Sequence, residues 1–419
     1  MTGHAAHDGY IPLRKGELIA AMARAGGLSE ADGAHFPAVS RLLSAILHHE
    51  AHERLEALKA LYDPLEPEAP EARRVTGEDG LRAFEAAFTE ALAKANFTEL
   101  THGVGVEGRT RLFTELKLKT SDLGIRAIRY FVRGAHNEEV QVKRFFLFRK
   151  KVTAPFVDDV IVLVAFKDES EIKKSARKRV FQMRRGVRPG AVMLKRFRNV
   201  AEEELISLHP GAKPAMPRRD QVILAAPAIA GGLPVALQLW PALSVLFAIV
   251  AIYFGAQGAV SQSELQRAVA ALSGLIAVGA FVMRQKLKYE RQTLLYQKRL
   301  SDTVYFRNLA NNAGVIDSLV AAGEEQDAKE ALLAYWALRR AQGPLAKSQI
   351  DKAAEDFLRA HGGRAVDFEI GDALAKLERL GVVARSGEAY AAQPCAEALK
   401  TLDGVWDAIF AYAQPQAAE

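Results

Sequence analysis

Residues 222–283 have the sequence VILAAPAIAGGLPVALQLWPALSVLFAIVAIYFGAQGAVSQSELQRAVAALSGLIAVGAFVM. This stretch contains no charged side chain from Val222 to Gly255 and none from Ala268 to Met283. A bilayer core about 30 Å thick needs roughly 20 apolar residues of helix, which rises about 1.5 Å per residue. The stretch therefore predicts a transmembrane helical hairpin, around which the rest of the chain would be organised.

We place the predicted hairpin at residues 240–284, with helices from about Trp240 to Ala256 and from about Arg267 to Met283. Trp240 and Tyr253 would be its membrane anchors, because aromatic rings favour the membrane–water interface. Proline and glycine interrupt the preceding apolar residues, so 216–239 is predicted to be an interfacial or re-entrant segment. A third crossing by this segment is the alternative.

Basic residues flank the apolar stretch on both sides, and they decide the predicted topology. They are Arg218 and Arg219 before it, and Arg284, Lys286, Lys288 and Arg291 after it. Basic flanks tend to stay cytoplasmic, so an even number of crossings is predicted, with both termini cytoplasmic. The predicted localisation is that of a multi-pass protein of a bacterial inner membrane. A buried helical hairpin inside a globular core is the alternative interpretation of the same residues.

The composition of the 419 residues is otherwise ordinary, with 49% hydrophobic and 25% charged residues. Cys395 is the single cysteine, which excludes a disulfide framework and a cysteine metal site within the chain and fits a reducing compartment. The first residues contain no apolar core of a signal peptide.

The segment before the apolar stretch divides into a helical part, residues 1–100, and an α+β domain, residues 101–210. Apolar residues at helical spacing predict helices over Phe36–Tyr62 and about Gly80–Ala95. From Arg109 to Lys167 the pattern changes to β-branched and aromatic runs, which predict three or four antiparallel strands.

Two parts of this strand region allow more specific predictions. Ile161–Phe166 is continuously apolar and predicts a central, buried strand. Tyr130 and Phe131 are predicted core residues, with Arg133 and Gly134 at a turn.

A basic block follows, because Lys167–Asn199 contains 12 Lys and Arg residues against 3 Asp and Glu residues. One interpretation is contact with an anionic lipid surface, where each basic residue contributes about 1 kcal/mol; a solvated basic face is the other. The predicted lipid-surface residues are Lys173, Lys174, Arg177, Lys178, Arg179, Arg184, Arg185, Arg218 and Arg219.

Beyond the hairpin we predict a juxtamembrane helix, 285–323, and a winged-helix-like domain, 324–419. Helices over Ala328–Arg340, Lys347–Ala360 and Val366–Leu380 precede two short strand runs, an order typical of a winged helix-turn-helix. Residues 324–419 contain 11 basic and 16 acidic side chains. Because DNA binding requires positive charge, we expect this domain to contact protein, and nucleic acid is an unlikely partner on charge grounds.

A run of charged residues opens this last domain, and it has two interpretations. It is either a solvated helix start, where acids favour the positive end of the helix dipole, or a polar contact surface. Its charged members are Glu324, Glu325, Asp327, Lys329 and Glu330.

The densest group of metal ligands is HHEAHE, residues 48–53, in which His48 and His52 share one face of a helix. Such a pair can bind zinc, but the order differs from HExxH and no third ligand is identifiable. A solvated helix face is the alternative. The letters GVGVEG at 103–108 match a dinucleotide fingerprint, but strand-like residues follow where a helix is required, so no cofactor is predicted.

Several segments together resemble the transmembrane protein 143-like family, a group of membrane proteins with domain of unknown function 3754. They are YIPLRK (10–15), LYDPLEP (61–67), RYFVRG (129–134), FRNVAEEELISLHPGAK (197–213), VYFRNLANNAGVIDSLV (304–320) and EEQDAKEALLAYWAL (324–338). The resemblance extends from about Tyr10 to about Trp406. It implies a membrane topology but no mechanism, because the family has no established activity.

The predicted fold class is thus an α+β membrane protein with an N-terminal helical and antiparallel β region, a transmembrane hairpin and a C-terminal winged-helix-like domain. The predicted function is to present domains to a protein partner or a lipid surface, with self-association as a further expectation and no catalytic motif. A membrane-associated, metal-assisted enzyme, an oligomeric transport component and a tethered nucleic-acid binder are the alternatives.

Overall fold

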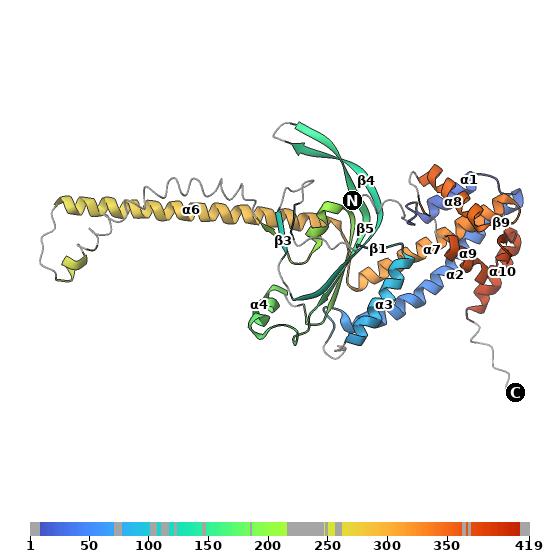
Figure 1. Cartoon of the computed structure of the whole chain (residues 1–419), viewed down its shortest axis with the longest axis horizontal. Helices are drawn as coiled ribbons and strands as arrows, with labels where there is room; N and C mark the ends of the chain where they lie inside the picture. The colour runs from blue at the N-terminus through green and yellow to red at the C-terminus, as the bar shows by residue number, and fades with distance from the viewer. Residues whose placement is uncertain are drawn as a thin grey trace. The chain divides into compact units, whose positions relative to one another are not determined.

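The computed structural model describes most of the chain, which consists of two compact units (Figure 1). The first unit comprises residues 1–103, 122–202 and 307–419, and the second comprises 104–121 and 203–306. The residues described are 9–70, 78–100, 107–109, 117–120, 124–144, 148–184, 187–215, 247, 250–255, 262–362, 366–367 and 370–410.

The first unit is built on helices that wrap a long central one, α7. Its helices are α1 (Lys15–Arg24), α2 (Glu30–Tyr62), η1 (Asp63–Leu65), α3 (Glu78–Lys94), α4 (Lys174–Arg184), α7 (Ala313–Ala341), α8 (Lys347–Gly362), α9 (Ile370–Arg379) and α10 (Cys395–Ala408). The predicted helices over Phe36–Tyr62 and Gly80–Ala95 are confirmed as α2 and α3, although α2 begins earlier, at Glu30. Ser29 caps α2 by accepting a hydrogen bond from the Asp32 amide.

A five-stranded antiparallel sheet forms the other layer of this unit, in the order β1-β4-β5-β6-β8. Its strands are β1 (Thr98–Glu99), β4 (Ile125–Arg144), β5 (Phe148–Phe166), β6 (Val192–Ala201) and β8 (Asn308–Asn311). The register aligns Tyr130 with Val162, Val162 with Lys195, and Lys195 with Asn311. The antiparallel strands and the buried central strand are therefore confirmed, because β5 is paired on both sides and Val160–Phe166 are at most 3% exposed.

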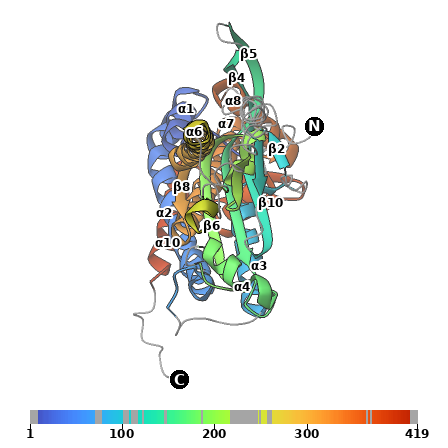
Figure 2. The ribbon, with the colours of Figure 1, turned by 90° about the vertical axis from the view of Figure 1, so that its left-hand side faces the viewer.

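The strand region differs from prediction at Gly134, which lies inside β4 and not at a turn. It has φ +71°, and a side chain there would collide with the Asp158 carboxylate. A glycine therefore lets the strand continue through a conformation that other residues adopt at a cost. Beyond the Phe156–Ala201 pair, β4 and β5 continue as a two-stranded ribbon that extends past the rest of the sheet (Figures 1 and 2).

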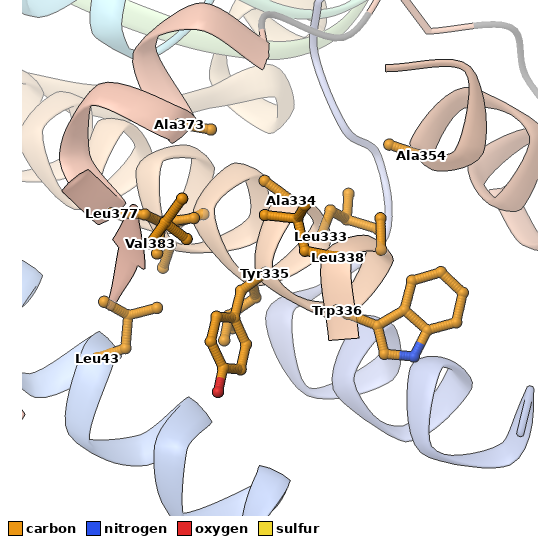
Figure 3. Packing of buried hydrophobic residues seen from close by; sticks show 14 of the residues in the cluster. Leu43, Leu333, Ala334, Tyr335, Trp336, Leu338, Ala354, Ala373, Leu377 and Val383 are labelled. Atoms are coloured by element: carbon orange, nitrogen blue, oxygen red, sulfur yellow. The ribbon is translucent and has the colours of Figure 1, made fainter. Parts of the chain in front are cut away.

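Two hydrophobic cores meet along α7. The first packs the C-terminal half of α7 against α1, α2 and α8–α10, around the fully buried Tyr335 and Trp336 (Figure 3). The second packs the N-terminal part of α7 with the C-terminal half of α2, α3 and one face of the sheet. Residues Ala328–Leu338 are buried on every side of the helix, a pattern typical of a helix inside a domain core.

The C-terminal part of the chain has the winged-helix order of elements, namely α7, β9 (Leu345–Ala346), α8, α9, β10 (Val383–Ser386) and β11 (Ala389–Ala392). Its three strands pair antiparallel in the order β10-β11-β9. Gly387 has φ +64° between β10 and β11, where glycine supplies the positive φ that a tight hairpin turn needs.

The second unit contains a small antiparallel sheet, β2-β3-β7, and a long helix, α6 (Gln262–Arg307, whose last residue belongs to the first unit). Its strands are β2 (Glu107–Arg109), β3 (Lys117–Thr120) and β7 (Ala212–Ala215). A 3-10 helix, η3 (Glu202–Leu208), precedes β7 in the chain.

The transmembrane hairpin is the main error of the sequence-based prediction. Within the described part of the chain, no helix combines the length and the apolar character that a bilayer crossing requires. The predicted second span lies in α6, where the uncharged run Ala268–Met283 covers only about 24 Å of helix, short of a core about 30 Å thick. The same helix continues through the charged residues Arg284–Arg291 to Arg307.

The membrane fold class, the multi-pass localisation and the cytoplasmic termini depended on that hairpin and are withdrawn with it. The first predicted span, with its anchor Trp240, falls mostly outside the described residues. The predicted interfacial segment 216–239 lies entirely outside them. The other anchor, Tyr253, is 86% exposed. What the structure shows is an α+β protein with antiparallel sheets.

Candidate functional site

The charged run that opens the last predicted domain lies well inside α7, which begins at Ala313, and three of its five charged residues are buried. Asp327 and Lys329 are each 2% exposed, and Glu330 is 5% exposed. The interpretation as a solvated helix start is therefore wrong. Buried charges are costly unless they are paired, so these groups are expected to have partners on other elements. These partners identify the segments that the middle of α7 connects.

The first set of partners belongs to the N-terminal segment before α1. The Gln326 side chain accepts a hydrogen bond from the Ile11 amide at 3.1 Å and donates one to the Ile11 carbonyl at 3.3 Å. The Lys329 ammonium donates to the same carbonyl at 3.1 Å and lies 2.9 Å from Glu325. Burial lowers the pKa of Lys329, although Glu325 opposes this change. The middle of α7 thus fixes the start of the described chain.

The second set of partners comes from α9 and α2 and converges on Asp327. The Lys376 ammonium of α9 donates to Asp327 at 2.6 Å and also to Asp372. Arg54 of α2 approaches the other Asp327 oxygen at 3.3 Å. Burial would lower the pKa of Lys376, but the two carboxylates outweigh it and raise the pKa above its usual value. The Lys376 charge is therefore held inside the protein.

Glu330 completes this cluster on the side facing α3. It accepts a hydrogen bond of 3.2 Å from the Asn96 side-chain amide, which also donates to the Gly9 carbonyl. Burial raises the pKa of Glu330 to about 8, against the smaller lowering effects of Lys376 and Asn96. At neutral pH the group is therefore mostly protonated, and it behaves as a neutral hydrogen-bonding residue.

Three carboxylates of this cluster, from Asp327, Glu330 and Asp372, bring ligand atoms within 4.8 Å of one another. The Lys376 ammonium already bonds to two of them, and the third is mostly protonated at neutral pH. The arrangement therefore supplies its own cation and is explained as a structural cluster.

The predicted metal pair lies elsewhere, on α2. His48 and His52 are both exposed, and the His48 ring nitrogen Nδ1 lies 2.7 Å from Glu324. Among the described residues, neither histidine belongs to a group of three ligands that could hold an ion. The metal assignment to His48 and His52 stays a prediction.

The second cation on α9, Arg379, is also paired within the chain. Its two guanidinium nitrogens donate to the two Glu50 oxygens at 2.7 and 2.9 Å, a bidentate pair between α9 and α2. In a winged helix that binds DNA, the second helix of the helix-turn-helix lies in the major groove. Here the basic side chains of that helix, Lys376 and Arg379, are both bound to carboxylates of the same chain.

The C-terminal end of α10 exposes two aromatic side chains close together in sequence. Trp406 is 36% exposed and Phe410 is 62% exposed. The Phe410 ring packs edge-on against His49 of α2 at 5.3 Å between centroids. Asp403 and Asp407, on the same turns, are exposed. These four residues form an apolar patch with acidic neighbours, which we call the α10 patch (Asp403, Trp406, Asp407, Phe410).

A buried ion-pair cluster secures the sheet of the same unit. Arg133 of β4 donates to Asp159 of β5 at 2.6 and 2.9 Å, and Arg196 of β6 donates to the same carboxylate at 2.9 Å. Burial would raise the pKa of Asp159, but the two guanidinium groups hold it below its usual value. Arg133 also bonds the Ala95 carbonyl and Arg196 the Ser318 carbonyl. The cluster therefore attaches the sheet to α3 and α7.

The predicted lipid-surface residues lie around α4. Lys173, Lys174 and Lys178 are exposed and have no ion pair among the described residues, whereas Arg177 pairs with Glu169 at 3.0 Å. The side chains of Arg179 and Arg184 lie outside the described part of the chain. The residues Arg185, Arg218 and Arg219 lie outside it altogether. The structure brings three of the nine predicted residues onto one exposed segment.

Sequence reasoning missed Glu50, Asp327 and Lys376 as interacting residues. Apart from Asp372, which lies four residues before Lys376, their partners lie tens to hundreds of positions away, where no local spacing reveals them. The available signal was the position of the charged run directly before the apolar segment ALLAYWAL (331–338), which cannot be solvated on all sides if the helix is buried.

The structure is an α+β protein whose C-terminal part has the winged-helix order of elements, with both basic side chains of α9 paired within the chain. A model of the family described as "Protein of unknown function (DUF3754)" matches residues 157–314. The match includes most of β5, all of β6 and β8, and residues 203–306 of the second unit, but neither α2 nor the winged-helix elements β9–β11. The chain therefore contains a domain of unknown function, while the narrower resemblance to transmembrane protein 143 stays a prediction. No solved structure matches the chain.

Proposed function

We propose that this chain is an interaction protein whose winged-helix unit binds a protein partner that carries a basic, apolar segment. The observation that carries the proposal is the pairing of both α9 cations with carboxylates of α2, α7 and α9 itself. Residues 324–419 as a whole have 11 basic against 16 acidic side chains. Such a surface repels phosphate and attracts basic protein segments.

The contact is assigned to the α10 patch. Tryptophan is among the residue types that dominate binding energy at protein interfaces, and phenylalanine is enriched in their buried centres. Asp403 and Asp407 add the charge that complements lysine or arginine on the partner. A short amphipathic helix with leucine on one face and lysine on the other has this chemistry.

A titration with a labelled Leu/Lys helical peptide at physiological salt tests the proposal. The intact protein should bind the peptide saturably, and the double variant Trp406→Ala, Phe410→Ala should bind it at least tenfold more weakly. The matched control is Tyr305→Ala, Phe306→Ala, which removes two exposed aromatic side chains of similar size. A short DNA duplex should not bind in the range of about 1–100 μM that is usual for non-specific complexes.

Equal peptide affinity for the wild type and the Trp406→Ala, Phe410→Ala variant would contradict the assignment to α10. Saturable, salt-dependent DNA binding would contradict the proposal as a whole. The Trp406→Ala, Phe410→Ala variant should fold like the wild type, because both side chains are exposed and their removal should not affect either hydrophobic core. Peptide binding and DNA binding can therefore both be measured on folded protein.

A second candidate function, contact with an anionic lipid surface, is favoured by Lys173, Lys174 and Lys178, which are exposed and form no ion pair within the described ranges. Each contributes about 1 kcal/mol near an anionic surface, so replacing all three by glutamine should weaken binding to phosphatidylserine vesicles about 100-fold. Co-sedimentation measures this effect, with the exposed lysines Lys352 and Lys400 replaced in a control. Equal sedimentation of the two variants would remove this candidate.

A further inference from the structure

A cavity of about 170 Å³ lies between α2, α3 and α7 in the first unit. It is separate from the α10 patch and from the carboxylate cluster, although Arg54 lies between the cavity and that cluster. These three helices pack alongside one another (Figure 1). A cavity of about 150 Å³ is large enough to hold benzene, so this one has room for a small organic molecule.

The walls of the cavity are apolar. Leu58 and Leu61 come from α2, Ala87 and Ala91 from α3, and Val320 from α7. Leu58 is 3% exposed and Val320 is 9% exposed, so the inner wall is shielded from water. Helix α7 lies close to the end of α3 at Gly323, where a Cβ would be in van der Waals contact with Ala95 and Lys94 at 3.7 Å.

The rim carries four charged side chains, the cations Arg54 and Lys94 and the acids Glu90 and Glu324. Glu324 is engaged by His48, whose ring nitrogen lies 2.7 Å away, and by Lys15 at 3.8 Å, while the Glu90 side chain is 70% exposed to water. Lys94 has only a loose contact with Glu90 at 3.8 Å.

Arg54 is the second cation at the rim. Its guanidinium bonds one Asp327 oxygen, and Lys376, which also bonds Asp372, takes the other. Of the five N–H donors of a guanidinium, one bonds within the described residues. An anionic head group at the rim would therefore meet available donors from both Arg54 and Lys94.

We propose that this cavity, which we call the α2–α3–α7 pocket (Arg54, Leu58, Leu61, Ala91, Lys94, Val320), binds a medium-chain carboxylate. The alkyl chain lies against the leucine, alanine and valine walls, where burial of methylene groups is favourable. The carboxylate lies at the rim, where it accepts hydrogen bonds from Arg54 and Lys94. Small-molecule sites commonly combine an apolar cavity with a few polar groups that orient the ligand.

Calorimetric titration of the full chain with octanoate tests the proposal. Octanoate should bind one site with a Kd of about 1 mM or tighter, and octyltrimethylammonium, of equal chain length and opposite charge, should bind at least tenfold more weakly. Absence of octanoate binding, or equal binding of the two probes, would overturn the proposal.

Matched variants on α3 locate the site. Ala91→Leu fills the cavity and should weaken octanoate binding at least tenfold, whereas Ala93→Leu makes the same change at an exposed position of the same helix and should not alter it. If Ala91→Leu does not fold, Ala87→Leu and its exposed neighbour Ala86→Leu form an equivalent pair. Unchanged binding by a folded cavity-filling variant would place octanoate elsewhere and contradict the assignment.

Rim variants test the role of charge. Lys94→Gln should weaken octanoate binding severalfold, and Glu90→Gln, which removes the nearest acid from the same rim, should not weaken it. Weaker binding by Glu90→Gln than by Lys94→Gln would contradict the proposed orientation of the carboxylate.

Discussion

At the residue scale, Lys376 connects three helices through one ammonium group. It bonds Asp327 of α7 and Asp372 of its own helix, and Arg54 of α2 shares the Asp327 carboxylate. Removing one member of a buried charge pair leaves its partner uncompensated, which is usually far more costly than replacing both members.

Lys376→Ala should therefore destabilise the protein by about 3–5 kcal/mol. Urea unfolding followed by circular dichroism measures the free energy of unfolding. The double variant Asp327→Asn, Lys376→Ala should regain part of the loss, because it no longer buries a carboxylate whose only remaining cation among the described residues is Arg54 at 3.3 Å. A double variant less stable than Lys376→Ala would show that Asp327 is stabilised by partners other than Lys376.

The raised pKa of Glu330 leads us to predict that the stability of the protein depends on pH. Its pKa is raised to about 8 in the folded protein and returns to 4.5 on unfolding. Between these values the folded state binds more protons than the unfolded state, so stability falls as pH rises from about 4.5 to about 8, by up to about 1.4 kcal/mol per unit. Below 4.5 both states are protonated and the effect is absent.

Glu330→Gln should remove this pH dependence. The free energy of unfolding of the variant, relative to that of the wild type, should therefore increase by a few kcal/mol from pH 5 to pH 8. Thermal unfolding at several pH values measures it, with exposed Glu397→Gln as the control. If the difference in free energy of unfolding between the variant and the wild type does not change with pH, Glu330 is ionised in the folded protein.

Residues that pack locally could be predicted from sequence, and residues that pair at long range could not. Tyr130 and Phe131 were recognised as core residues because their neighbours alternate as in a strand, and both are at most 4% exposed. Asp327 and Lys376 were not recognised as buried residues. A charged side chain is expected to face solvent unless its partners are known, and Asp327 and Lys376 are far apart in the sequence.

At the element scale, β4 depends on Gly134. Sequence reasoning placed a turn there because glycine commonly ends strands, whereas the strand in fact passes through a positive φ beside Asp158. Helices α2 and α3 were predictable from periodic apolar residues. The predicted hairpin failed because the uncharged run of α6, Ala268–Met283, covers only about 24 Å, short of a bilayer core about 30 Å thick.

Gly134→Ala should cost about 1–3 kcal/mol through backbone strain and the clash with Asp158. Gly387→Ala is the matched control: its φ is also positive, at +64°, but no atom lies within 4 Å of the added carbon. Denaturant unfolding should show a larger loss for Gly134→Ala than for Gly387→Ala. Equal losses would show that φ alone, and not the contact with Asp158, determines the requirement.

At the scale of the whole molecule, the first unit is assembled from three separate segments of chain. Strand β8 returns to the edge of the sheet after the second unit and pairs with β6, so that Phe197 lies opposite Asn308. The ends of the intervening segment, 203–306, therefore emerge from neighbouring strands. This arrangement is typical of an insertion that the host unit does not need in order to fold.

Replacing residues 203–306 by a Gly/Ser linker of about eight residues should leave a folded first unit. Its near-ultraviolet circular dichroism, to which the buried Tyr335 and Trp336 contribute, should persist, with one cooperative thermal transition. Loss of cooperative unfolding would show that the second unit is required for the first.

The most direct test of the proposed function is hydrogen–deuterium exchange of the intact chain with and without the Leu/Lys peptide. Binding at the α10 patch predicts slower exchange in residues 403–410 and no change in α9 or in the β10–β11 hairpin. Protection centred on α9 and that hairpin, or protection there on addition of DNA, would contradict the account.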